Sequence, residues 1–531
     1  MSRRTVGPPR AGAGPGPWSA SHGPGTEAGG PGSHAIPSAD PGARPEFFDP
    51  HRPLARELTM GVTDAFTLAA VGDCVVSRPM SGYLRDQGFA SVMKLVTSAG
   101  VRYANLETVI FDINAFRGHP YSFDADWPLV SHPWVAEDLA ALGFQVLSRA
   151  NNHALDWGIE GMRETSRWLD AVGLVHAGTG ERRGLARAPR YLEAPQGRIA
   201  LVSFTSSYRP TSDALPDRGA APGRPGVSAL GVSPIELVPQ ALFDALKATP
   251  GAGVSGQPRP DVAPRPAAPR PGGDAKRITR FGITFKAAPV RGTLFDLDLV
   301  DVAEILLNIR QGKENSDFVM AAIHAHQSDN GYQFGSAILQ PAGFLAPLAK
   351  AAIDAGASAF ITTGNHNIGP VEVYQGKPIV YGIGNFFWSD TQEPIPQDLY
   401  QAPDYRARAE RAFEHPERMT DADLTALLNA EGGFANRFTF QSYIAMCRFS
   451  PGLHGGMGGL TDFRLYPITL RYGERLTWSG IPDVPGPAES VQILSDIRAC
   501  SLPLGTVIEI VADDGPWVYG RVALAGGGRS P

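Results

Sequence analysis

Cysteine and long apolar runs are both scarce in this sequence of 531 residues. Its three cysteines, Cys74, Cys447 and Cys500, are scattered singly, which excludes a disulfide framework and a zinc ribbon and favours a reducing compartment. No apolar run approaches the roughly 18 to 20 residues of a membrane span, and the N-terminus lacks the apolar core of a secretion signal. We therefore expect a cytoplasmic protein with no direct membrane span.

An excess of positive charge is also missing. The 47 Lys and Arg residues are outnumbered by 53 Asp and Glu residues, which gives a formal net charge of -6. Because nucleic-acid binding depends on a basic field, this balance predicts no nucleic-acid partner. The hydrophobic share of 43% is sufficient for at least one large core, so a folded globular protein is expected.

Glycine and proline, by contrast, are concentrated in two stretches. Residues 1–50 contain ten Gly and ten Pro, and residues 249–273 contain five Gly and seven Pro. Such compositions bury too little apolar surface to fold, so we predict a disordered tail (1–55) and a disordered insertion (249–273), both dispensable for folding. The folded domain is predicted to span 64–512, with a helical excursion at 389–436 and a C-terminal tail at 513–531.

The rest of the chain repeats a short apolar run, a polar loop and a helical segment, which is typical of a layered α/β domain. The predicted strands are Phe66–Val71, Val101–Ala104, Phe144–Leu147, Ile199–Phe204, Phe318–Ile323 and Ala359–Ile361. The predicted helices are Phe89–Val96, Trp134–Leu142, Ile159–Val172 and Phe344–Ala355, of which the last three end at glycines placed as C-caps.

Further strands follow toward the C-terminus. Val371–Tyr374 and Pro378–Tyr381 flank Gln375-Gly376 and predict a β-hairpin, because Gly376 can supply the positive φ of the turn. We also predict strands at Phe440–Phe449, Phe463–Leu470 and Val507–Val511, and a helix at Ala488–Ala499.

Polar side chains follow five of the apolar runs, where open α/β sheets place their ligand sites. In chain order they are Asp73, Glu107, Asn152 with His153, His324 with His326, and His366. Carboxylate, amide and imidazole ligands suit Mn, Fe or Zn, and a dinuclear centre of this kind could polarise a phosphoryl oxygen and activate water. The pattern therefore favours phosphoester hydrolysis, although any one of these residues alone is more often structural.

The order and spacing of several motifs resemble the CapA-like bacterial capsule-synthesis (PGA_cap) family, over roughly residues 64–512. The stretches that carry the resemblance are GDCVVSR, YANLETVI, SRANNHALDWGIEGM, HAGTGE, AAIHAHQ and NHNIGPVEVYQGKPIVYGIGNFFW. This family is a branch of the calcineurin-like metallophosphoesterases. The resemblance implies an α/β fold, specifically a four-layer α/β/β/α sandwich, with a divalent metal site at the sheet ends.

The resemblance also implies roles for individual residues. Asp73, Glu107, Asn152, His324 and His366 match metal ligands, with Glu107 in the place of a bridging Asp. His153 matches a general acid or transition-state stabiliser, and His326 is expected to join it in catalysis. Arg78 and Asn151 are assigned to substrate binding, although Arg78 could equally be a solvated or helix-capping residue.

Some positions depart from the family pattern. Val75 stands where the superfamily has a histidine ligand, Thr363 and Gly364 stand where relatives tend to have another, and Gln327 replaces a frequent Glu. We therefore expect the second metal position to be weak. Asn385 could face the site or cap a turn, and His119, His132 and His176 are interpreted as structural.

Three functions remain open from the sequence. The first is a metal-dependent phosphoester hydrolase linked to capsule or poly-γ-glutamate synthesis, with an anionic polymer, phosphoester or peptide substrate. The second is a non-catalytic accessory protein with a degenerate site. The third is metal-independent acid/base chemistry of the peptide-epimerase type, using His153 and a second group across the cleft.

Overall fold

A computed structural model describes residues 60–121, 128–209, 211–249, 277–329, 338, 340–389, 403–420, 423–424, 427, 430, 435–452, 458–513 and 515–524. These residues all belong to one compact unit, Asp49–Pro531. The predicted tail and nearly all of the predicted insertion lie outside the described residues. The folded part begins slightly earlier than predicted, because Met60 and Val62 are buried in the core.

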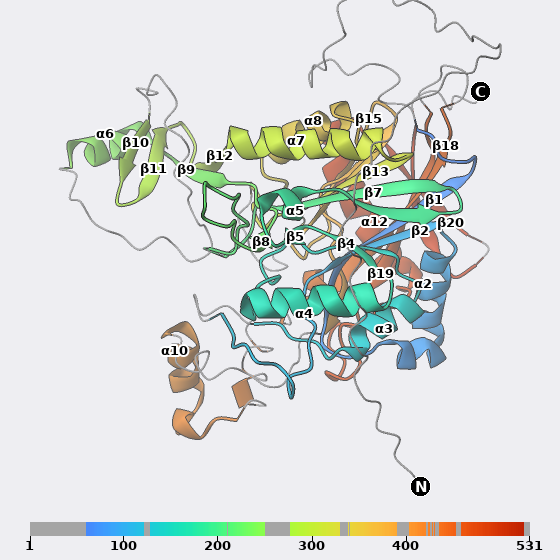
Figure 1. Cartoon of the computed structure of the whole chain (residues 1–531), viewed down its shortest axis with the longest axis horizontal. Helices are drawn as coiled ribbons and strands as arrows, with labels where there is room; N and C mark the ends of the chain where they lie inside the picture. The colour runs from blue at the N-terminus through green and yellow to red at the C-terminus, as the bar shows by residue number, and fades with distance from the viewer. Residues whose placement is uncertain are drawn as a thin grey trace, which may run out of the picture. The chain divides into compact units, whose positions relative to one another are not determined.

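A large mixed sheet contains the first strands of the chain (Figure 1). In the described residues its lateral order is β20 (Ile508–Ala512), β21 (Val518–Val522), β19 (Gly459–Thr469), β18 (Gln441–Ser450), β1 (Phe66–Val76), β2 (Val101–Leu106), β3 (Val146–Ser148) and β4 (Val175–Ala177). Strands β1 to β4 are parallel, β18 is antiparallel to β1, and β17 (Asn385–Ser389) also pairs with β1 in parallel.

A second sheet contains the strands of the middle of the chain. Its order among the described residues is β15 (Val371–Tyr374), β16 (Lys377–Val380), β14 (Ala359–Thr363), β13 (Phe318–His324), β7 (Gly197–Thr205) and β6 (Arg190–Ala194). The predicted hairpin is β15 and β16, and its turn residues Gln375 and Gly376 have φ of 50° and 69°. Strands β7, β13 and β14 are parallel, so their C-terminal ends meet at one edge.

The two sheets pack face to face, with helices on both outer sides. The helices over the first sheet are α2 (Gln87–Thr97), α3 (Trp134–Ala141) and α4 (Gly158–Ala171), and those over the second are α7 (Leu299–Glu314) and α8 (Leu345–Asp354). Figure 1 shows α7 and α8 on one side of the sheets and α3 and α4 on the other.

Alternation along the strands produces these layers. In β13, Met320 and Ala322 face the core between the sheets, whereas Val319 and Ile323 face the core beneath α7 and α8. Three apolar clusters thus separate four layers, which confirms the predicted α/β/β/α sandwich.

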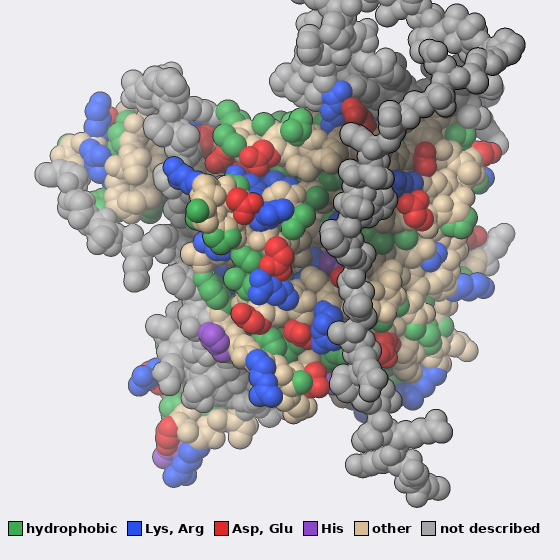
Figure 2. All heavy atoms as spheres, in the orientation of Figure 1, with side chains coloured by type: hydrophobic (Ala, Val, Ile, Leu, Met, Phe, Trp, Pro, Cys, Tyr) green, Lys and Arg blue, Asp and Glu red, His purple; other side chains and the backbone are tan. Residues whose placement is uncertain are grey.

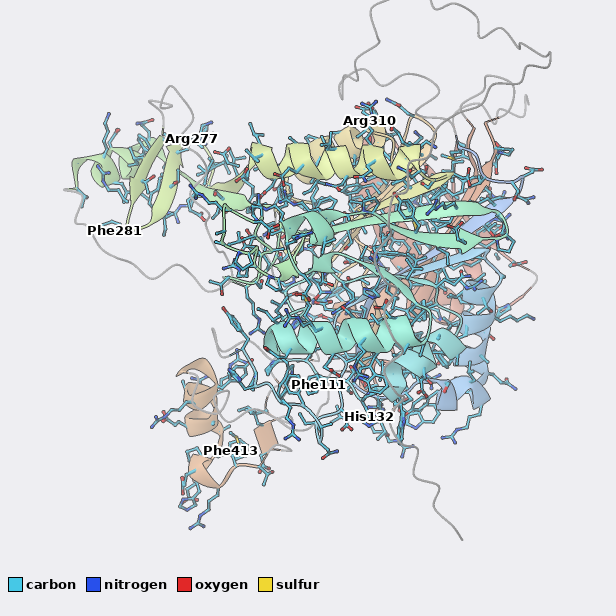
Figure 3. The ribbon with its side chains drawn as sticks, viewed as in Figure 1. Phe111, His132, Arg277, Phe281, Arg310 and Phe413 are labelled. Atoms are coloured by element: carbon cyan, nitrogen blue, oxygen red, sulfur yellow. The ribbon has the colours of Figure 1, made fainter. Side chains whose placement is uncertain are left out.

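A small four-stranded sheet was not predicted. It consists of β10 (Arg277–Arg280), β11 (Ile283–Ala287), β9 (Val232–Val238) and β12 (Gly292–Leu297), accompanied by α6 (Gln240–Ala248). Figure 3 labels Phe281 at the turn between β10 and β11, where its φ is 54°. In the sequence, the predicted insertion therefore falls between α6 and β10, two elements of this small subdomain.

The remaining elements include one long helix, α12, and several short ones. They are β5 (Thr179–Gly180), β8 (Gly226–Val227), α5 (Arg183–Arg187), α10 (Pro403–Ala412), α12 (Pro487–Ser501) and the 3-10 helices η1 (Ser81–Arg85), η2 (Pro416–Arg418), η4 (Arg437–Phe440) and η5 (Leu502–Leu504). Helix α10 agrees with the predicted helical excursion, most of whose other residues are not described.

The predicted C-terminal tail is wrong in part. β21 lies between β19 and β20 in the first sheet, so the folded domain extends beyond residue 512 to at least Val522.

No helix among the described residues combines the length and apolar character that crossing a bilayer requires. On the face shown in Figure 2, Lys and Arg side chains are interspersed with Asp and Glu side chains.

Candidate metal centre

The C-terminal ends of strands from both sheets meet at the candidate site. β1 supplies Asp73, the segment after β2 supplies Glu107, and β13 ends at His324. The β1–β17 pairing shifts register between Asp73 and Cys74, where Phe386 of β17 is the extra residue, and such bulges re-aim side chains near functional sites. Gly72 allows the adjoining backbone to approach, because a Cβ there would lie 1.8 Å from the carbonyl oxygen of Gly384.

Five of the predicted residues converge in a buried cluster. His324 Nε2 lies 3.4 Å from Glu107 Oε1 and 2.9 Å from Asn152 Oδ1. His366 Nε2 lies 3.8 Å from the same Glu107 oxygen, and His366 Nδ1 lies 3.5 Å from Asp73 Oδ2. The structure therefore brings together all five residues that the sequence predicts as ligands.

Two groups of possible ligands share Glu107. One group is Glu107, His324 and His326, and the other is Asp73, Glu107 and His366, with the ligand atoms of each group within 4.8 Å of one another. A single carboxylate that belongs to both groups is the arrangement expected of a bridging ligand. His326 Nε2 lies 3.2 Å from His324 Nε2, so the structure places His326 as a possible ligand as well as a possible catalytic residue.

The electrostatics of the cluster suit a cation. Asp73 and Glu107 are both fully buried. Burial raises the pKa of Asp73 to about 6, although hydrogen bonds from Asn105 and the backbone of Gly364 lower it in part. Two buried carboxylates are costly without a compensating positive charge, and a divalent ion would supply one.

His324 has the protonation state that a ligand needs. Burial lowers the pKa of His324 well below its ordinary value, and neighbouring imidazoles lower it further, so the ring is neutral near pH 7. If Nε2 binds a metal, the proton must sit on Nδ1, and Thr363 Oγ1 lies 3.2 Å away to accept it. Asn105 Nδ2 is also 3.2 Å from this nitrogen and donates to Asp73 Oδ1 at 2.7 Å.

Asn385 holds His366 in place. Its Oδ1 lies 2.7 Å from His366 Nδ1, and its Nδ2 donates to the carbonyl oxygen of Thr439 at 3.0 Å. This pairing assigns the proton to Nδ1 and leaves Nε2 of His366 as the ligand atom. Of the two interpretations left open by the sequence, Asn385 therefore faces the site.

His153 lies at the rim of the cluster. Its Nε2 is 4.0 Å from Glu107 Oε1, and its Nδ1 is 2.7 Å from Asp156 Oδ2. Asp156 is fully buried and its other oxygen lies 3.0 Å from Nη2 of Arg209, a residue that follows β7. A carboxylate on Nδ1 orients the ring and stabilises its protonated form, as an acid catalyst requires.

The departures from the family pattern have structural explanations. Val75 belongs to the apolar cluster beneath the outer helices, so its side chain packs in a core. Gly364 has φ of 105°, and a Cβ there would lie 2.9 Å from Ala325 N and 3.0 Å from the His324 ring. The amide of Gln327 accepts from Ser206 Oγ at 2.7 Å and donates to Ser206 O at 3.1 Å, which a carboxylate could not do.

The two residues assigned to substrate have other contacts. Arg78 donates to Ser389 Oγ at 3.0 Å and to the carbonyl oxygen of Thr477 at 3.1 Å. Asn151 is buried, donates to Leu106 O at 2.8 Å and accepts from His153 N at 3.1 Å. Both sets of contacts tie chain segments together, and Asn151 shapes the loop that carries Asn152 and His153.

The sequence prediction missed four residues that support the cluster: Asn105, Asp156, Arg209 and Thr363. Asn105 and Asp156 belong to the motifs already quoted, and their position beside predicted ligands was the available signal. Arg209 lies in another part of the chain, and only the packing of the loop after β7 brings it to Asp156.

The fold and the cluster together define a class of protein. A four-layer α/β/β/α sandwich with a carboxylate, amide and imidazole cluster at the ends of strands from both sheets is the metallophosphoesterase-like architecture, and its donor set is compatible with a divalent metal.

Comparison with known proteins identifies the family. The model of "Bacterial capsule synthesis protein PGA_cap" matches residues 67–390. The chain therefore belongs to this bacterial capsule-synthesis family. The match spans every residue of the candidate cluster.

Two relatives match this chain over most of their length. Uncharacterized proteins y4sH and y4uA of Sinorhizobium fredii (strain NBRC 101917 / NGR234) are each 37% identical over 461 residues, which is 85% of this chain and 92% of each relative. A crystal structure of a hypothetical protein from Thermus thermophilus aligns with a TM-score of 0.30 and 11% identity, covering 78% of this chain and 95% of that one.

Proposed function

We propose that this protein is a metal-dependent phosphoester hydrolase linked to capsule or poly-γ-glutamate synthesis, with a phosphoester used in that process as its substrate. The observation that carries the proposal is the burial of Asp73 and Glu107 among His324, His366 and Asn152. Family membership supports the setting in capsule synthesis.

The proposed ligands fall into two groups that share Glu107. Asp73 and His366 belong with one position, and His324, Asn152 and His326 with the other. A bound divalent metal, of the Mn, Fe or Zn type, would polarise the phosphoryl oxygen and lower the pKa of water. We expect one position to bind weakly, because Val75 and Gly364 replace imidazoles.

The chain's own residues supply the rest of the chemistry. Asp156 holds the Nδ1 proton of His153, so Nε2 faces the cluster and can donate a proton to the leaving oxygen. Asn385 accepts the Nδ1 proton of His366, which keeps Nε2 of that ring directed at the cluster, and Thr363 Oγ1 lies within hydrogen-bond distance of His324 Nδ1.

The test combines metal content with turnover. The full chain is purified without chelator, its Mn, Fe and Zn content is measured, and hydrolysis of p-nitrophenyl phosphate and bis-p-nitrophenyl phosphate is followed with each metal added. Asp73→Asn and Asn152→Ala should lose bound metal and turnover while keeping the far-UV spectrum of the parent. A matched control is Asp170→Asn, an exposed carboxylate on α4.

Two outcomes would overturn the proposal. Bound metal without turnover of either phosphoester would favour an accessory binding protein. Full activity in metal-free protein, or exchange of a peptide α-proton in deuterated water, would favour metal-independent acid/base chemistry.

A further inference from the structure

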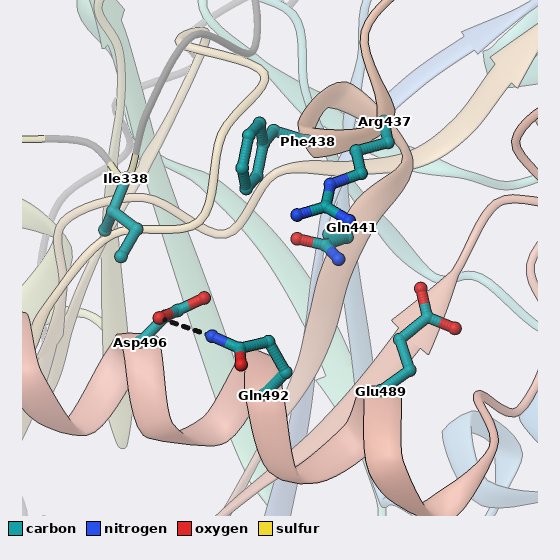
Figure 4. Close-up of a pocket in the computed structure, with 7 residues that line it drawn as sticks. All are labelled: Ile338, Arg437, Phe438, Gln441, Glu489, Gln492 and Asp496. Atoms are coloured by element: carbon teal, nitrogen blue, oxygen red, sulfur yellow. Dashed lines mark hydrogen bonds between the residues drawn. The ribbon is translucent and has the colours of Figure 1, made fainter.

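A second polar cleft lies outside the metal cluster. It has a volume of about 620 Å³ and is lined by η4, the start of β18, α12 and Ile338. Figure 4 shows Arg437 and Gln441 on one side and Glu489, Gln492 and Asp496 on α12. None of these residues is used by the proposed reaction.

Gln441 indicates that the cleft is built to receive a hydrogen-bond donor. Its side chain is only 6% exposed, yet its Oε1 has no hydrogen-bond partner among the described residues. A buried acceptor that stays unpaired is destabilising, so such groups normally have a partner or a ligand. Gln441 lines the cleft, where a ligand can provide the missing donor.

The other charged groups define the ligand further. The two carboxylates accept hydrogen bonds from neutral groups: Glu489 Oε1 from Thr469 Oγ1 at 3.4 Å, and Asp496 Oδ1 from Gln492 at 3.0 Å. Arg437 is exposed and its guanidinium stacks 5.0 Å from the ring of Phe438, which leaves its N–H fork available for a planar carboxylate.

A zwitterion satisfies both sets of groups. A simple anion would be repelled by the carboxylates of Glu489 and Asp496, and a simple cation would be repelled by Arg437. An ammonium group beside Gln441 and shared by the two carboxylates, with a carboxylate on Arg437, gives each charged group a neighbour of opposite charge. We propose that this cleft binds a free α-amino acid, with an apolar side chain against Phe438 and Ile338.

The cleft is linked to the metal cluster through residues 439–441, at the junction of η4 and β18. Asn385, which holds His366, donates to the carbonyl oxygen of Thr439, two residues before Gln441. The segment 439–441 thus contributes to both places. The inference goes beyond the proposed hydrolase and does not depend on turnover.

The test uses three matched compounds and the full chain. Binding of L-leucine, N-acetyl-L-leucine, which lacks the ammonium, and L-leucinamide, which lacks the carboxylate, is measured by isothermal titration calorimetry up to 10 mM. We expect L-leucine to bind about tenfold or more tightly than either derivative, because each derivative leaves one charged side of the cleft unpaired.

Protein variants test separately which residues recognise the ligand's carboxylate and which recognise its ammonium group. Arg437→Ala should weaken L-leucine binding about tenfold and abolish its advantage over L-leucinamide. The double variant Glu489→Gln with Asp496→Asn should abolish the advantage over N-acetyl-L-leucine. Arg498→Ala, an exposed cation on α12 that does not line the cleft, is the matched control and should change nothing.

Contrary results are equally specific. Equal binding of all three compounds, no binding of any of them, or an unchanged preference in Arg437→Ala would overturn the proposal. None of these results bears on hydrolysis, because phosphoester turnover is measured separately and its residues are not altered.

Discussion

At the scale of single residues, Asp156 has a positioning role that a comparison of motifs does not reveal. It contacts no predicted ligand, but it lies between His153 and the buried Arg209. Its carboxylate also accepts from Leu129 N at 2.6 Å, so its position is fixed from three directions. The acid chemistry proposed for His153 therefore depends on a residue that acts through it.

Replacing Asp156 tests this dependence. Asp156→Asn should lower kcat roughly ten- to a hundredfold with little change in bound metal, because an amide orients the ring less well and cannot stabilise the imidazolium. The alkaline limb of the pH–rate profile should also move to lower pH, which a purely structural role would not produce. Glu164→Gln, an exposed carboxylate on α4, is the control. Equal losses of metal and kcat would contradict a positioning role.

His176 provides a residue-scale prediction for stability. Burial, together with the nearby charges of Arg149 and Arg190, lowers the pKa of His176 to about 3, and its partner Asp170 is too exposed to compensate. The unfolded chain takes up this proton near pH 6.5, so the native state is destabilised as pH falls below that value.

The expected change is large enough to measure. Between pH 7.5 and pH 5 the free energy of unfolding should fall by roughly 2 kcal/mol on account of His176. Urea unfolding at both pH values, with wild type and His176→Gln, checks this: the variant should lose that part of the pH dependence. Parallel curves for the two proteins would show that His176 is not the group responsible.

At the scale of elements, the close approach of β17 to β1 depends on Gly72. Asp73 N donates to Gly384 O at 3.1 Å, and a methyl group on Gly72 would lie 1.8 Å from that same oxygen. Gly72→Ala should therefore lower the free energy of unfolding by about 3 kcal/mol or more and disturb the bulge that aims Asp73. Gly82→Ala, where nothing lies within 4 Å of the added Cβ, should be neutral. Similar unfolding midpoints for the two variants would refute this account.

The sequence was informative for elements whose signals are local. β1, β2, β7, β13 and β14 are buried parallel strands, so each is an almost unbroken apolar run, and the β15–β16 hairpin is set by its own turn. The strands of the small sheet are only half-buried, as in Arg277–Arg280, and such short polar runs carry little hydrophobic signal. β17 pairs with β1 over a distance in sequence that no local pattern records.

The same distinction holds for the candidate site. Asp73, Glu107, Asn152, His324 and His366 each follow an apolar run, so their convergence at the sheet edge could be predicted from chain order alone. Arg209 and Asn385 gain their roles only through packing between distant segments. Gly364 could be recognised from the sequence as a departure from the family pattern, but the steric reason for the glycine is visible only in the folded structure.

At the scale of the whole molecule, the C-terminal end of the chain completes the larger sheet. β21 pairs with β19 on one side and with β20 on the other, so it is the strand that joins β20 to the sheet. Tyr519 and Val522 are at most 5% exposed, and Gly520 lies against Leu494 of α12. A chain ending at residue 512 would therefore lose both the strand and part of the surface on which α12 packs.

Two truncations test whether β21 is part of the folded domain or belongs to a dispensable tail. A chain ending at Ala512 should lose roughly 2–5 kcal/mol of stability, because it forfeits buried aromatic and aliphatic side chains and leaves β20 without its partner. A chain ending at Leu524 keeps all of β21 and should match the full-length protein. Thermal and urea unfolding of both truncations and the full chain provide the comparison. If the chain ending at Ala512 unfolds at the same midpoint as the chain ending at Leu524, β21 adds nothing to the domain, and a boundary at residue 512 would be correct after all.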